Sequence, residues 1–186
     1  MFGVILLLLV FSSLPTQITP SAYDDADAYE VYAAVLPSEW PLRDAHAKQL
    51  VIRRETKSFQ MCLKPDSEIE AKVGPAIANY VKLNERQWSL QPILSLATPY
   101  QLLEVRKFEA LMSQGQWDEY YRQYPESGGL IELSAVGFNI DKTIAVVYMG
   151  HSCGALCGGG TFHVLEKMDG KWKPFQWKGA SCAWAS

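Results

Sequence analysis

The sequence predicts an α+β domain in which N-terminal helices pack on a C-terminal antiparallel β-meander. Two patterns carry this prediction. Apolar residues recur at helical spacing through the first two thirds of the chain, and apolar and polar residues alternate between turn signals in the last third. An apolar leader precedes both patterns. We therefore expect a signal peptide at residues 1–21 and a single α+β domain at residues 22–186.

The leader begins with an unbroken apolar run at Phe2–Phe11. This run is shorter than the roughly 20 apolar residues that cross a bilayer, but it has the length of a signal-peptide core. Pro15 and Pro20 follow it, and the small residues Ser21 and Ala22 offer a cleavage point. We expect a secreted or periplasmic protein with no stable membrane span after cleavage. The alternatives are an uncleaved anchor and a buried N-terminal strand.

The charge of the chain bears on its partners. The formal net charge is −3 for 186 residues, and the sequence contains no basic patch. Nucleic-acid binding depends on clustered Lys and Arg that neutralise phosphates, so nucleic acid is not an expected partner. A chain of this length fits one domain that can bury about 70% of its unfolded surface. The expected partner is an unknown protein or small molecule.

Four cysteines, an even number, favour disulfides in an exported chain. Cys153 and Cys157 lie four residues apart in a glycine-rich loop that can bend sharply. Of the three possible pairings, the preferred one is therefore Cys153–Cys157 with Cys62–Cys182. The second bond would tie the C-terminus to the middle of the chain.

We expect the first helix to begin near Asp24 and Asp27 and to end before Pro37. Tyr29, Tyr32 and Leu36 lie at helical spacing between these ends. A short strand is expected at 49–57. Ser67 and Glu70 form a capping box that predicts the start of the next helix. Gly74-Pro75 should kink or split that helix.

A second capping box, Thr98 with Gln101, predicts another helix N-terminus, with Pro99 at its first position. The apolar face of this helix would comprise Leu102, Val105, Phe108 and Met112. A short helix at 116–123 should then carry three aromatic residues inward before Pro125: Trp117, Tyr120 and Tyr124.

The last third predicts the strands of the meander, at 131–138, 143–149, 161–168 and 171–177. Asp169-Gly170 joins the last two with a strong type I′ hairpin signal.

One pentapeptide suggests catalysis. Gly150-His151-Ser152-Cys153-Gly154 matches G-x-S-x-G, the strand-to-helix turn that exposes a hydrolase nucleophile. The order of a hydrolase triad is Ser, acid, His, yet no acidic residue lies between Ser152 and His163. Three glycines and a strand pattern follow instead of a helix. His46 could supply a base from upstream, but a glycine-rich β-connection is the favoured interpretation.

The same segment suggests metal binding. His151, Cys153, Cys157 and His163 are residue types that bind zinc in tetrahedral sets. The cysteine spacing suits zinc and the histidine spacing does not. Because a disulfide competes with thiolate ligation in an oxidising compartment, no metal or other cofactor is expected.

A set of C-terminal motifs carries a family resemblance. The motifs are W-D-E-Y-Y from Trp117, L-S-A-V-G-F-N from Leu133, A-V-V-Y from Ala145, C-G-A-L-C-G-G-G from Cys153 and L-E-K-M-D-G-K-W from Leu165. Across residues 117–173 the chain resembles a group of exported bacterial proteins of unknown function. The resemblance implies an exported one-domain protein and supplies no catalytic residue.

These observations favour a non-enzymatic binding or interaction protein of the cell envelope or exterior. The expected binding surface is the loop 150–160 with its neighbours, and its candidate residues are Tyr148, His151, Ser152 and His163, because loops on a rigid sheet commonly carry function. The alternatives are a hydrolase that uses Ser152, a metal site at 151–163, and a structural envelope protein without a specific ligand. No catalytic residue is assigned.

Overall fold

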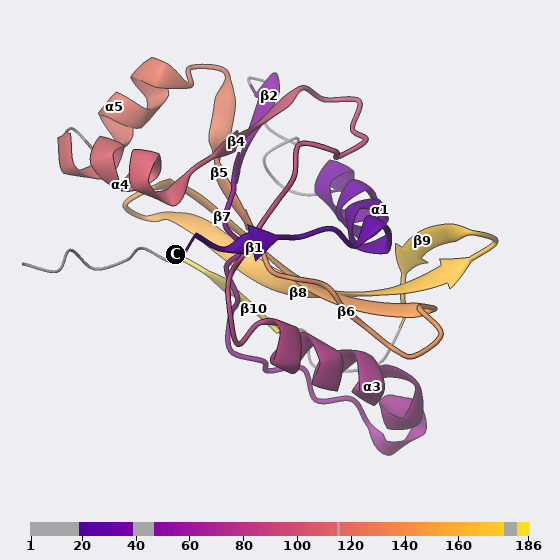
Figure 1. Ribbon diagram of the computed structural model, residues 1–186. Coiled ribbons are helices and arrows are strands. Elements are labelled where there is room, and N and C mark those ends of the chain that lie inside the picture. The colour runs from indigo at the N-terminus through magenta and orange to yellow at the C-terminus, as the bar shows by residue number, and fades with distance from the viewer. Residues whose placement is uncertain (1–18, 39–46, 115, 177–181) are drawn as a thin grey trace, which may run out of the picture.

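The computed structural model describes residues 19–38, 47–114, 116–176 and 182–186 (Figure 1). The core of the predicted signal peptide falls outside these residues. The described helices are α1 (Ala26–Val35), the 3₁₀ turn η1 (Leu36–Ser38), α3 (Ser67–Leu83), α4 (Val105–Gln114) and α5 (Gln116–Gln123). The described strands are β1 (Ser21–Ala22), β2 (Gln49–Arg53), β3 (Trp88–Ser89), β4 (Tyr100–Leu103), β5 (Ser127–Leu133), β6 (Gly137–Phe138), β7 (Ile144–Gly154), β8 (Cys157–Met168), β9 (Lys171–Pro174) and β10 (Ala183–Ala185).

The main sheet has the strand order β10-β8-β7-β5-β2-β4, with β6 paired to β7 and β9 to β8. The α+β class is confirmed, but the sheet is mixed, because β2 runs parallel to both β4 and β5. The C-terminal strands β5, β7, β8 and β9 pair antiparallel, but β2 and β4 add parallel pairs, so the predicted arrangement of N-terminal helices on an antiparallel meander is not confirmed. Long crossover connections explain the difference: α3 lies between β2 and β4, and α4 and α5 lie between β4 and β5, so these strands can align in parallel. For the same reason the helices are not all N-terminal to the sheet.

One face of the sheet is covered by α1. Asp25 caps this helix by accepting a hydrogen bond from the backbone N–H of Asp27. The buried side of α1 packs on alternate residues of the sheet, such as Ile52 and Val147. Tyr32 is fully buried there, and its hydroxyl donates a 2.7 Å hydrogen bond to the carbonyl of Ser134. The first predicted helix is thus confirmed, with its N-cap between the two acidic residues that signalled it.

An ion-pair cluster joins α1 to the turns beside it. Lys142 Nζ lies 2.9 Å from a carboxylate oxygen of Asp25 and 3.0 Å from one of Asp27. Lys167 Nζ lies 3.0 Å from both Asp27 and Glu30. Hydrogen bonds from Lys167 and then Lys142 lower the pKa of the Asp27 carboxyl. The cluster ties the N-terminus of α1 to the β6–β7 turn and to the β8–β9 hairpin.

The opposite face of the sheet is covered in part by α3, and Figure 1 shows α1 and α3 on opposite sides. Val73 and Tyr80 of α3 pack with Val146 of β7. The helix is capped by Asp66, whose side chain accepts from two backbone N–H groups, so the predicted Ser67–Glu70 capping box was wrong by one position. The helix spans 17 residues with Pro75 inside it and is not split.

Helices α4 and α5 cover the same face at the β2–β5 end, where Val51 alternates with the α1-facing residues Leu50 and Ile52. The predicted helix start at Thr98 was wrong, because the residues after it form β4 and pair with β2. Helix α4 begins at Val105, whose backbone N–H donates to the carboxylate of Glu55.

The predicted short helix at 116–123 is confirmed as α5. Tyr120 and Tyr124 are buried in its core cluster, and Trp117 packs against that cluster while partly buried.

The strand boundaries in the last third differ from the predicted ones. Residues predicted as one strand, 131–138, divide between the end of β5 and β6. The predicted strands 143–149 and 161–168 are parts of the longer β7 and β8, because pairing continues to Gly154 and Cys157. The type I′ signal of the β8–β9 hairpin agrees with positive φ angles at its two central residues, 52° and 73°.

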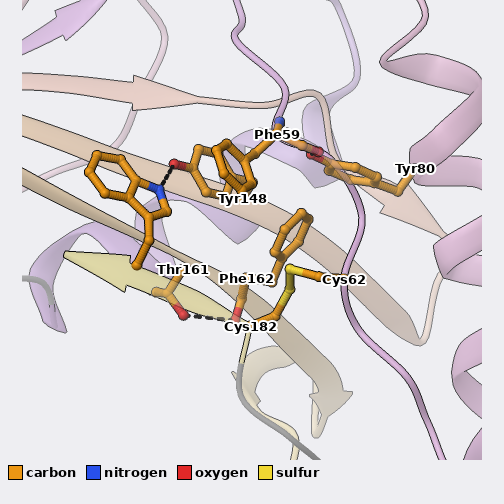
Figure 2. The surroundings of a disulfide bond; sticks show 8 residues. Phe59, Cys62, Tyr80, Tyr148, Thr161, Phe162 and Cys182 are labelled. Atoms are coloured by element: carbon orange, nitrogen blue, oxygen red, sulfur yellow. Dashed lines mark hydrogen bonds between the residues drawn. A yellow bond between two sulfur atoms is a disulfide. The ribbon is translucent and has the colours of Figure 1, made fainter. Parts of the chain in front are cut away.

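Two disulfides complete the fold: Cys62 with Cys182, and Cys153 with Cys157, the pairing that the spacing favoured. The Cα atoms of Cys62 and Cys182 are 5.7 Å apart although the residues are separated by 120 positions. This bond joins the segment before α3 to the start of β10. Figure 2 shows it beside Phe162 and Tyr80, which form an edge-to-face pair in the α3-side core.

Candidate functional site

The candidate site lies at the end of the β7–β8 hairpin, which α5 contacts through a hydrogen bond from the Tyr121 hydroxyl to the carbonyl of Cys153. Their ladder continues through Ser152 opposite Gly158 and ends with Gly154 opposite Cys157. The Cys153–Cys157 disulfide closes this end of the hairpin, with Cα atoms 5.0 Å apart. Between them Leu156 is 86% exposed, an unusual position for a large apolar side chain.

A groove with a volume of about 510 Å³ runs along this end of the sheet. Its lining comes from the ends of β7 and β8, the hairpin tip and the edge strand β10. The lining residues are Met149, His151, Leu156, Cys157, Gly158, Gly159, Gly160, Thr161, Ala183, Trp184, Ala185 and Ser186. Apart from His151, every side chain in this set is apolar, absent or a neutral hydroxyl, so the groove is open and largely apolar.

Three successive glycines form one wall of the groove. Gly158, Gly159 and Gly160 leave the backbone of β8 without side chains between β7 and β10. At Gly160 the absence of a side chain is required on the opposite face as well, because a Cβ there would overlap the hydroxyl of Tyr148 and the indole nitrogen of Trp184. The glycine run therefore both opens the groove and lets β10 approach β8.

The edge strand β10 is fixed from the opposite face of the sheet. The indole Nε1 of Trp184 donates a 2.8 Å hydrogen bond to the hydroxyl of Tyr148. Phe59 stacks on Tyr148 with ring centroids 5.2 Å apart, as Figure 2 shows. The backbone N–H of Phe162 donates to the carbonyl of Cys182, at the point where the long-range disulfide enters β10. The Trp184 hydrogen bond, together with the backbone bond and the disulfide at the adjacent Cys182, thus holds this three-residue strand in place.

His151 is the single ionisable side chain of the groove lining, and it is 6% exposed. Its Nε2 lies 2.6 Å from the carbonyl oxygen of Gly128. Because a carbonyl can only accept, Nε2 carries the hydrogen. Burial lowers the pKa of His151, and the hydrogen bond to Gly128 opposes this effect without reversing it. The imidazole is therefore neutral at pH 7, and the groove presents no ionised side chain.

The structure separates the residues predicted as one binding surface. His151 pairs with Ile131 and lies on the α1 face, where it lines the groove. Tyr148 and Ser152 lie on the opposite face by strand alternation. His163 pairs with Val147 on the α1 face, four residues along β8 from the partner of His151. Of the four predicted residues, only His151 lines the groove. Tyr148 lies on the opposite face of the sheet, where its hydroxyl accepts the hydrogen bond from Trp184 of β10.

The G-x-S-x-G pentapeptide does not form a nucleophile elbow. Gly150 to Gly154 belong to β7, an extended strand that continues into a hairpin rather than a helix. Ser152 faces away from both His151 and His163. His46, the possible upstream base, lies outside the described residues.

The zinc set is also dispersed. Cys153 and Cys157 are bonded to each other, so neither presents a thiolate. Within the described ranges, no group of three or more His, Cys, Asp or Glu residues is arranged to hold a metal ion.

Sequence reasoning did not identify the contribution of β10. The short alternation at Cys182–Ser186 was the available signal, with Ala183 and Ala185 on one side and Trp184 on the other. A three-residue strand is too short for alternation alone to identify it, and its partner strand lies more than twenty residues away along the chain.

Comparison of the chain with protein-family models, with curated proteins and with solved structures gave no match. Among the helices that the structure describes, none has the length and apolar character needed to cross a membrane.

Proposed function

We propose that the protein is an exported binding protein that holds an extended apolar polypeptide segment in the groove beside β10. One observation carries the proposal: a groove of about 510 Å³ without an ionised side chain lies against an edge strand of the sheet. A charged ligand would lose part of its hydration there without meeting a side chain of opposite charge. An apolar ligand would gain from burial in proportion to the apolar area removed from water.

The edge strand favours a polypeptide over a compact small molecule. Trp184 forms the hydrogen-bonded pair with Gly160, so the backbone groups of Ala183 and Ala185 point away from β8. The unpaired backbone N–H and C=O groups of an edge strand can form hydrogen bonds with an added strand. Pockets that take every second side chain of the bound polypeptide then give specificity. Leu156 supplies an exposed apolar contact at the hairpin tip beside the same groove.

Export is supported by two features. The apolar run at residues 2–11 has the length of a signal-peptide core. Two disulfides are also typical of oxidising compartments. The resemblance to exported bacterial proteins points the same way. Intact mass of the protein recovered after export, with thiol alkylation before and after reduction, tests this part: we expect loss of about the first 21 residues and no reactive thiol until reductant is added.

The binding proposal is tested with a fluorescently labelled apolar peptide and fluorescence anisotropy. Leu156→Asp places a charge at the groove and should weaken binding about tenfold or more. Ile140→Asp is the matched control, because Ile140 is 95% exposed in the β6–β7 turn and does not line the groove. Equal affinity of the two variants, or tighter binding of a charged peptide of the same length, would contradict the proposal.

A further inference from the structure

The Cys153–Cys157 bond is accessible at the tip of the β7–β8 hairpin. Both cysteines are partly exposed, and the two residues between Gly154 and Cys157 are exposed. The β7–β8 ladder ends at the Gly154–Cys157 pair, and within the described residues no further strand pairs beyond it. Both halves of the disulfide are therefore partly open to solvent.

Cys157 also lines the groove, together with Leu156 and the residues of β10. An extended polypeptide bound beside β10 would place its own side chains next to this cysteine. The carbonyl of Cys153 accepts a 2.9 Å hydrogen bond from the hydroxyl of Tyr121, which holds the other half of the disulfide from α5. The two halves of the disulfide are thus inequivalent: Cys157 lines the groove, and the backbone of Cys153 is held by α5.

The hairpin does not depend on this disulfide for closure. The β7–β8 ladder pairs residues from Ile144 to Gly154 with residues from Glu166 to Cys157, so ladder hydrogen bonds already hold both strands at the tip. The Cys62–Cys182 bond has a different position, because it connects two segments 120 residues apart. The ladder therefore still joins the two strands when Cys153–Cys157 opens, whereas opening Cys62–Cys182 removes a covalent link at the start of β10.

We propose that Cys153–Cys157 is a reactive disulfide that oxidises the thiols of a polypeptide bound in the groove, an activity that rests on the proposed function. A client thiolate attacks Sγ of Cys157, the S–S bond breaks, and its electron pair leaves on Sγ of Cys153, which takes up a proton. A second client thiolate then attacks the client sulfur of the mixed disulfide and expels Cys157 as a thiolate, which takes up the second proton. The client loses two electrons and two protons in forming its disulfide, and Cys153 and Cys157 gain both. A small-molecule disulfide such as oxidised glutathione restores the bond by the same exchange.

The test uses the full chain with both disulfides formed and a synthetic apolar peptide that contains two reduced cysteines. Samples are quenched with acid, alkylated and analysed by mass spectrometry of the cysteine-containing fragments. We expect Cys153 and Cys157 to become reduced while Cys62–Cys182 stays intact, about tenfold faster than with a peptide of equal cysteine spacing in which charged residues replace the apolar ones. In a second assay the apolar peptide carries a single cysteine as a mixed disulfide with thionitrobenzoate. The free thiolate of each variant attacks the cysteine sulfur of this peptide and releases thionitrobenzoate. Cys153→Ser should become linked to the peptide through Cys157, and Cys157→Ser, the matched control, should become linked much less through Cys153.

Equal rates for the two peptides, equal linkage of the two variants to the peptide, or reduction of Cys62–Cys182 at the same rate would overturn the inference. A third peptide with serine in place of both cysteines separates the two proposals. If this peptide binds and the dithiol peptide is not oxidised, the exchange activity is wrong and the binding function stands. If it does not bind, the binding function is wrong, and the exchange activity that rests on it is overturned too.

Discussion

The indole of Trp184 on the edge strand β10 donates a hydrogen bond to the hydroxyl of Tyr148 on β7, across the intervening strand β8. The two strands do not pair with each other, so this side-chain bond is a direct link between them that bypasses the ladder. It exists because Gly160, which lies between them on β8, has no side chain to separate the two rings. A wall of the groove therefore depends on an interaction on the opposite face of the sheet.

Removal of this bond should loosen β10. Trp184→Phe removes the donor and leaves the buried Tyr148 hydroxyl without it, which should lower the free energy of unfolding by about 1–3 kcal/mol. Urea unfolding of Trp184→Phe, Tyr148→Phe and the double variant measures the coupling, which should be about 0.5–1.5 kcal/mol. Strict additivity of the two single changes would show that the bond does not hold the strand.

A methyl group at Gly160 should disturb the same link more strongly. Gly160→Ala places a Cβ on the Tyr148 hydroxyl and the Trp184 indole, so β10 must shift, and we expect a loss of about 1–3 kcal/mol in unfolding free energy together with weaker peptide binding. Gly154→Ala is the control in the same hairpin, because its Cβ would meet only the Cβ of Cys157, at 3.3 Å. Comparable loss in both variants would argue against a specific role for Gly160.

Acid should destabilise the protein through His163. Burial lowers its pKa from 6.5 to about 4, so the unfolded chain binds a proton between these values that the folded chain does not. The stabilising contribution of neutral His163 is thus fully present above pH 6.5. The free energy of unfolding falls as the pH is lowered from 6.5 to 4, by at most about 3 kcal/mol.

His163→Gln should flatten this dependence in urea unfolding measured between pH 4 and 7. A smaller slope should persist, because the pKa of His151 is lowered as well. Asp27 does not contribute to the slope between pH 4 and 7. Its stabilising effect is fully present above its usual pKa of 3.8 and is lost only as the pH falls through the lowered pKa. An unchanged slope in the variant would contradict the assignment.

The ion-pair cluster at the N-terminus of α1 should contribute modestly. Lys142→Gln removes contacts to both Asp25 and Asp27 and should lower the unfolding free energy by about 1 kcal/mol, less at high salt. Lys48→Gln removes an exposed pair with Glu126 and should have an effect near zero. Unfolding curves at low and high ionic strength distinguish the two variants, and a salt-independent effect of Lys142→Gln would indicate a loss of packing instead.

The two disulfides should differ in their effect on stability. The chain-entropy relation gives about 5 kcal/mol for the 120-residue separation of Cys62–Cys182 and about 2 kcal/mol for the four-residue separation of Cys153–Cys157. Paired Cys→Ser variants compared by urea unfolding should show the larger loss at Cys62 and Cys182. A larger loss at Cys153 and Cys157 would show that the tip disulfide is the structural one.

Local chemistry explains which elements could be predicted. The hairpin at Asp169-Gly170 and the aromatic face of α5 depend on residues within one turn of each other, so their signals are complete in a short window. The close spacing of Cys153 and Cys157 likewise favoured their bond, and the other pairing followed.

The helix predicted from Thr98 failed for the opposite reason. Its capping signal is local, but the residues after it form β4 because β2, fifty residues earlier, offers a parallel edge for pairing. Tertiary pairing of this kind overrides a local preference worth about 1 kcal/mol.

The sequence by itself determined the α+β class, the type I′ hairpin, helix α5 and the glycine run that leaves one wall of the groove without side chains, because each depends on residues close together in the chain. Only the tertiary structure decided that β2 runs parallel to β4 and β5, and that β10 completes the groove. The position of β10 depends on Cys62 and Tyr148, which lie 120 and 36 residues from their partners. Contacts at such separations form only when the whole sheet assembles, so no local pattern in the chain encodes them.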